Sequence, residues 1–142
     1  MAEVGSSGRA VIIVGVIPTS AARGPQATMS AVIESNGADL AVCRLAGALD
    51  AEGAEQLREA MAECAAFRDV YLDLSHVRFM DSTALSVIIV GVRRARENGG
   101  EVSVCGVRGN IARLLTTVGF DRVAPIHETV PAVAAGTLVA AS

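Results

Sequence analysis

Apolar and polar residues in this chain follow two repeating patterns that succeed one another along the sequence. From Val70 to Leu74 every second side chain is apolar, the period of a β-strand with one buried face. After Ser82 apolar residues recur every three or four positions, the period of an α-helix. The same comparison predicts further strands at 31–35, 40–45, 101–106 and 122–126, and helices at 51–67, 82–98, 108–118 and 129–135.

The order of these elements predicts an α/β fold. Asn36-Gly37 separates the first two strands, and this pair is the strongest short signal for an antiparallel hairpin. The later strands alternate with helices, which favours parallel pairing. We therefore expect a small mixed, mostly parallel β-sheet of about five strands, with an N-terminal β-hairpin and about four helices backing it. Pro125 suits an edge position for the last strand.

The segment around Ser82 is the candidate functional region. A polar connection at 75–78 and Phe79-Met80 follow the central strand, and the helix then begins at Asp81-Ser82-Thr83. Asp and Ser both cap helix N-termini, and Asp50 is the equivalent candidate for the helix at 51–67. The start of the central helix is apolar nearly all round, whereas a helix on a sheet needs only one apolar stripe. Some of these side chains should therefore face solvent or a partner; the candidates are Ala84, Val87 and Val90.

A phosphate on Ser82 would have a clear physical effect. It would meet the free N–H groups and the positive end of the helix, so the fold would tolerate it. It would also add a charge of about −1.5 to −2 beside Asp81 and the apolar surface, which would repel a docked partner. The alternative is a plain helix cap, and Thr83 is the competing hydroxyl one residue later.

The sequence LDLSHVRFMDSTALSVIIVG resembles the signature of STAS domains, specifically the bacterial anti-sigma factor antagonists. The resemblance runs from about residue 30 to residue 135, and it implies the STAS fold with helices on one side of the sheet. It also implies that Ser82 is the phosphoacceptor, supported by Asp81 and Asp50. Ala48 stands where this family usually has Glu in a Gly-Glu-Leu-Asp sequence, which leaves a role for that carboxylate unsupported.

The resemblance further implies a non-catalytic, cytoplasmic switch protein. Its unphosphorylated form would bind an anti-sigma factor with serine kinase activity and so release the sigma factor. Phosphorylation of Ser82 would end binding, and a phosphatase would restore it. The expected partner-binding residues are Met80, Thr83, Ala84, Ser86, Val87 and Val90. The alternatives are a scaffold that is never phosphorylated, a nucleotide-sensing module and a small hydrolase; for the last, His76 is near in sequence, but a Gly-x-Ser-x-Gly elbow is missing.

The amino-acid composition argues against several classes of function. The formal net charge is −3 and no basic run occurs, which argues against direct DNA binding. All twelve basic residues are Arg, so Schiff-base chemistry and the phosphate-loop lysine are excluded. The three cysteines are widely spaced in apolar surroundings and are predicted to be free buried thiols in a reducing compartment. Only His76 and His127 could assist a metal site, so we expect neither metal nor cofactor.

The chain divides into three predicted parts. Residues 1–28 are an N-terminal extension whose apolar run at 10–17 is too short to cross a membrane and imitates a signal peptide only loosely. This run could form an extra edge strand or cover a neighbour, or Met29 could be the natural start. Residues 29–136 are the predicted STAS domain, and 137–142 a flexible tail. An exposed apolar helix would also suit a homodimer.

Overall fold

The computed structural model describes residues 2–4, 9–14, 29–36 and 39–130. This part of the chain forms seven strands, three α-helices and two short 3-10 helices. The strands are β1 (Ala2–Val4), β2 (Arg9–Val14), β3 (Met29–Asn36), β4 (Leu40–Leu49), β5 (Asp69–Met80), β6 (Glu101–Cys105) and β7 (Ile126–His127). The helices are η2 (Ala51–Gly53), α1 (Ala54–Cys64), α2 (Ser82–Glu97), α3 (Gly109–Thr117) and η3 (Phe120–Arg122). None of the described helices is long and apolar enough to cross a membrane.

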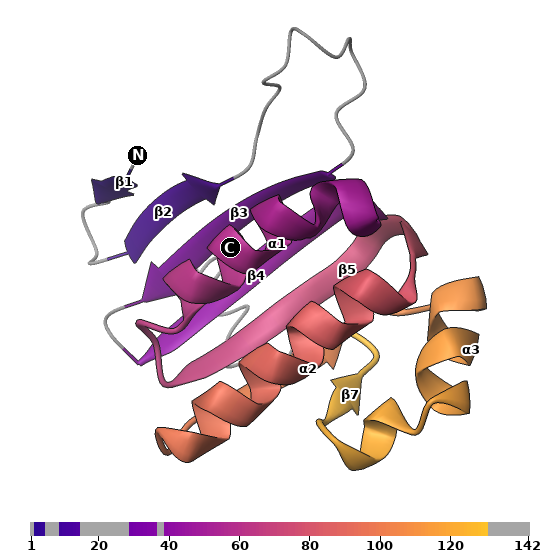
Figure 1. The fold of residues 1–142 in the computed structure, drawn as a ribbon. Helices are drawn as coiled ribbons and strands as arrows, with labels where there is room; N and C mark the ends of the chain where they lie inside the picture. Colours follow the sequence, from indigo (N-terminus) through magenta and orange to yellow (C-terminus); the bar gives the residue numbers. More distant parts are fainter. Residues whose placement is uncertain (1, 5–8, 15–28, 37–38, 131–142) are drawn as a thin grey trace, which may run out of the picture.

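The strands form one mixed sheet in the order β1-β2-β3-β4-β5-β6-β7. Strands β1 to β4 pair antiparallel, and β4 to β7 pair parallel. The predicted hairpin is confirmed as the β3–β4 pair, and the last strand lies at the predicted sheet edge. Helices α1 and α2 lie side by side on one face of the sheet (Figure 1). Because each follows a parallel strand, both helices begin at the same end of the sheet.

The core lies between this sheet face and the two helices. Alternate residues of β5 point toward the helices and are buried, as predicted for Val70, Leu72 and Leu74. Side chains on the opposite face are more polar. There Arg44 lies 3.0 Å from Asp73 and 3.1 Å from Glu34, so one guanidinium links carboxylates on the strands to either side.

Two strand predictions were wrong in their bounds. The predicted polar connection at 75–78 is the continuation of β5 to Met80, because the backbone there pairs with the far end of β4, up to Leu49 opposite Met80. Register shifts in this pairing interrupt the strict alternation of side chains, which hid the strand. The strand predicted at 122–126 is instead η3 followed by the short β7.

The two ends of the chain differ from the sequence-based prediction. Part of the N-terminal apolar run forms β2, which pairs antiparallel with β3 and brings the predicted five strands to seven. Of the helix predicted at 129–135, Thr129 and Val130 are not helical. The remainder of that helix and the predicted tail lie outside the described residues.

Gly100 occupies a position that has no room for a side chain. A Cβ there would overlap the Arg68 carbonyl oxygen, which also accepts a hydrogen bond from the Glu101 N–H at 3.0 Å. We expect Gly100→Ala to lower the free energy of unfolding by about 1–3 kcal/mol, because backbone must move. The control is Gly99→Asn: Gly99 has a φ of 84° with open space around it. Asn adopts that conformation, so its cost should be below about 1 kcal/mol. Equal urea midpoints for Gly100→Ala and the wild type would contradict the close approach.

Candidate functional site

The carboxylate of Asp81 organises the start of α2. Its Oδ1 accepts hydrogen bonds from the N–H groups of Thr83 and Ala84 at 3.0 and 3.1 Å. Its Oδ2 accepts a third bond from the Ala51 N–H at 3.2 Å. The Asp81 N–H itself donates to the Leu49 carbonyl oxygen at 3.1 Å. Asp81 is therefore the N-cap of α2 and also joins this helix to the turn that precedes α1.

Asp50 has the same role one strand away. It follows β4 and caps η2, with its Oδ1 accepting a hydrogen bond from the Gly53 N–H at 3.0 Å. The predicted cap at Asp50 is thus confirmed. Strands β4 and β5 are parallel neighbours, so Asp50 and Asp81 lie at the same edge of the sheet. Both carboxylates fix the chain where a strand turns into a helix.

Ser82 is exposed as the first residue of α2. Since Asp81 accepts hydrogen bonds from the N–H groups of Thr83 and Ala84, the Ser82 hydroxyl is not needed as a cap. Within the described residues that hydroxyl makes no hydrogen bond to another side chain or to the backbone. Ser86, one turn later, donates instead to the Ser82 carbonyl oxygen at 2.9 Å. Thr83 is also exposed, so both candidate hydroxyls are accessible to an enzyme.

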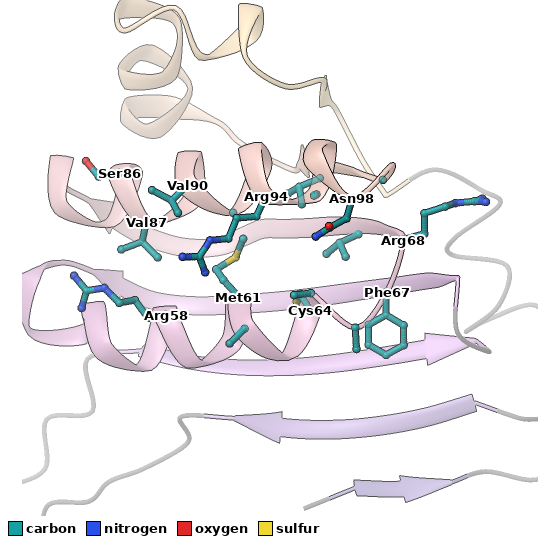
Figure 2. A pocket seen from close by; sticks show the side chains of 18 of the residues that line it. Arg58, Met61, Cys64, Phe67, Arg68, Ser86, Val87, Val90, Arg94 and Asn98 are labelled. Carbon is teal, nitrogen blue, oxygen red and sulfur yellow. The ribbon is translucent and has the colours of Figure 1, made fainter.

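The predicted partner-binding residues divide into two groups. Thr83, Ser86 and Val90 are exposed, and Val90 retains 46% of its accessible surface. Met80, Ala84 and Val87 are instead buried, with 6%, 0% and 9% of their surface exposed. The reason is that α2 contacts the sheet and α1 at once, so its buried face is broader than one stripe. Val87 points toward α1, as Figure 2 shows.

Phe79 is a surface residue that the sequence analysis missed. It is 51% exposed near the end of β5, three residues before Ser82. A large exposed aromatic side chain close in sequence to exposed hydroxyls is a feature of protein contact surfaces. Strict alternation along β5 would place Phe79 on the same strand face as the buried Val77, so the period of two does not reveal its exposure. The register shifts in the pairing with β4 interrupt that alternation.

Other reactive groups lie apart from this surface. Cys43, Cys64 and Cys105 are free and buried, as predicted. A hydrogen bond from the Cys43 thiol to Cys64, together with burial, raises the pKa of Cys43, while burial and the nearby Asp73 raise the pKa of Cys105 to about 12. These two thiols therefore stay protonated and weakly nucleophilic at neutral pH. His76 Nδ1 lies 3.3 Å from the Ser75 hydroxyl and makes no hydrogen bond to Ser82. In the described residues, no three His, Cys, Asp or Glu side chains gather as metal ligands would.

Comparison with known proteins identifies the family. The sequence model of the STAS domain matches residues 30–133. The chain belongs to the STAS domain family, which confirms the predicted family and fold class. One relative is the anti-sigma F factor antagonist of Paenibacillus polymyxa, 33% identical over 90 residues that cover 61% of this chain and 77% of the relative. Another is the anti-sigma-B factor antagonist of Staphylococcus aureus, 28% identical over 87 residues, or 60% and 81% of the two chains.

Solved structures support the fold. An anti-sigma factor antagonist from Mycobacterium paratuberculosis superposes with a TM-score of 0.63 at 22% identity, covering 79% of this chain and 92% of that one. The Bacillus protein SpoIIAA in its phosphorylated form gives a TM-score of 0.59 at 18% identity, with 77% and 98% of the chains covered. At such identities these likenesses establish the STAS fold alone.

Proposed function

We propose that this protein is an anti-sigma factor antagonist switched by phosphorylation of Ser82. The unphosphorylated form binds an anti-sigma factor that has serine kinase activity, and the sigma factor is thereby released. The protein itself is regulatory rather than catalytic, and it acts in the cytoplasm, where the kinase finds its ATP. The observation that carries this proposal is the exposed Ser82 hydroxyl, left free because Asp81 caps α2. The names of the relatives support the same class of function.

The charge at the start of α2 supports a switch that acts by repulsion. Asp81 already holds the N–H groups of Thr83 and Ala84, so a phosphate on Ser82 would add to an existing negative charge. That addition is about −1.5 to −2. No basic residue lies in the first turn of α2 to neutralise it. The cap itself would stay in place, so phosphorylation should change binding without unfolding the helix.

The proposed contact surface surrounds Ser82. It consists of the exposed side chains of Phe79, Ser82, Thr83, Ser86 and Val90. This mixture of one aromatic anchor, small hydroxyls and an aliphatic side chain resembles the core of a protein interface. A phosphate would stand among these side chains and would have to lose its hydration when a partner docks. A phosphatase that removes it would restore binding.

Mass spectrometry tests the proposal directly. The full chain, incubated with a candidate anti-sigma kinase and ATP, should gain one phosphate that peptide mapping assigns to Ser82. Ser82→Ala should gain none, because the acceptor oxygen is gone, whereas Thr83→Ala should be modified at the wild-type level. A phosphate that maps to Thr83 would overturn the assignment. Complex formation without any modification would favour the constitutive scaffold instead.

A further inference from the structure

A groove of about 750 Å³ runs between α1 and α2 (Figure 2). It begins beside Ser82 and Thr83 and continues toward Gly100 at the other end of the helices. Met61 of α1 and Val87 and Val90 of α2 line its middle. Its volume lies in the range of about 300–1,000 Å³ that is typical of small-molecule sites.

Small residues keep this groove open. Gly91 faces Met61 so closely that a Cβ on Gly91 would overlap the Met61 methyl group. The side chain of Met61 therefore crosses to α2 and forms an apolar floor, where larger residues would have filled the space between the helices. Alanines at 62, 65, 66 and 95 also line the groove, together with larger side chains such as Phe67 and Asn98. The result is an apolar groove whose floor is the contact between Met61 of α1 and Gly91 of α2.

The charge along the groove has one sign. Arg58, Arg68 and Arg94 line it, and none of the described Asp or Glu residues does so, although the chain as a whole carries a net charge of −3. Figure 2 shows the side chain of Arg94 reaching from α2 toward α1, while the side chain of Arg58 extends along α1 at the edge of the groove. Arg58 makes an exposed ion pair with Glu55 at 3.2 Å, which is weak and easily exchanged. In the described residues no carboxylate lies within salt-bridge distance of Arg94.

We propose that this groove binds an anionic amphiphile, an alkyl-chain carboxylate. The chain lies on the apolar floor formed by Met61 and Val87, and the carboxylate lies between Arg58 and Arg94. A guanidinium on each wall matches a carboxylate in charge and in hydrogen-bonding geometry. Arg94 lies twelve residues beyond Ser82 on α2, so this site extends well past the proposed phosphorylation surface.

Titration of the full chain with decanoate, followed by isothermal calorimetry and amide NMR shifts, tests the site without any kinase. We expect saturable binding, with shifts at Met61, Val87 and Gly91, and weaker binding of the neutral 1-decanol. Arg58→Gln/Arg94→Gln should lower decanoate affinity by roughly tenfold or more, because two charge-assisted hydrogen-bonding groups are lost. Arg113→Gln is the matched control, since Arg113 is an exposed arginine of α3 outside the groove.

The outcomes separate the alternatives. Equal decanoate affinity in the double variant and the wild type would overturn the proposal, as would shifts that map to Phe79 and Val118 instead of the groove. If an acidic peptide binds saturably and decanoate does not bind, the proposal is also overturned, and the groove is a site for a protein segment. Gly91→Leu, which fills the groove, should abolish binding; if this variant does not fold, the arginine variant still decides. Failure here would leave the Ser82 proposal untouched, because phosphorylation is measured separately.

Discussion

Replacing Ser82 by Asp is expected to weaken binding to the anti-sigma factor by roughly 30-fold, which corresponds to about 2 kcal/mol, because a second carboxylate beside Asp81 adds like charge to the contact surface. The side chain is exposed and Asp81 holds the cap, so the stability of the variant should stay close to that of the wild type. Affinity is measured by calorimetry or surface plasmon resonance with the purified anti-sigma factor. Raising the salt concentration should reduce the difference in affinity between the Ser82→Asp variant and the wild type, since exposed charges are screened.

Ser82→Asn is the control for this result. Asn has nearly the same shape as Asp but no charge, so its affinity should remain within a few fold of the wild type. If Asn and Asp weaken binding equally, the effect is steric and the electrostatic switch is wrong. If neither variant changes the affinity, Ser82 lies outside the interface altogether.

Asp81→Ala is expected to lower the free energy of unfolding by about 2 kcal/mol, the sum of a lost helix cap and a lost hydrogen bond from the Ala51 N–H. Both oxygens of Asp81 are used: one by Thr83 and Ala84, the other by Ala51. Asp81→Asn keeps one acceptor oxygen and can still cap α2, so it should cost about 1 kcal/mol. Urea unfolding of the two variants measures both values.

Asp50→Ala provides the comparison for this experiment. Its side chain accepts from a single N–H group, that of Gly53, so its loss should cost about 1 kcal/mol. An Asp81→Ala variant no less stable than Asp50→Ala would show that the link to Ala51 contributes nothing. The geometry requires that Asp81→Ala lower the free energy of unfolding most. Asp81→Asn and Asp50→Ala should lower it by smaller amounts that are similar to each other.

Local sequence patterns predicted the elements that depend on local chemistry. Asn36-Gly37 predicted the hairpin, and Asp50 and Asp81 predicted where helices begin, because turns and caps are set by a few neighbouring residues. The far half of β5 was missed because its pairing with β4 passes through register shifts, and a partner strand cannot be read from one segment.

The candidate site was predicted in part for the same reason. The position of Ser82 at the start of α2 followed from the local pattern, and the exposure of Val90 did too. The burial of Ala84 and Val87 could not be predicted from the local pattern, because it depends on α1 packing beside α2. Periodicity shows how many apolar positions a helix has, whereas tertiary contacts decide which of them remain exposed.

The pairing of β2 with β3 limits how copies of this chain could associate. In the described sheet β3 is an interior strand, with β2 on one side and β4 on the other. The outermost strands, β1 and β7, have three and two residues. Strands this short offer few unpaired backbone groups, so the sheet is a poor template for growth by strand addition. A homodimer of this protein would therefore be held by side chains rather than by pairing of strands.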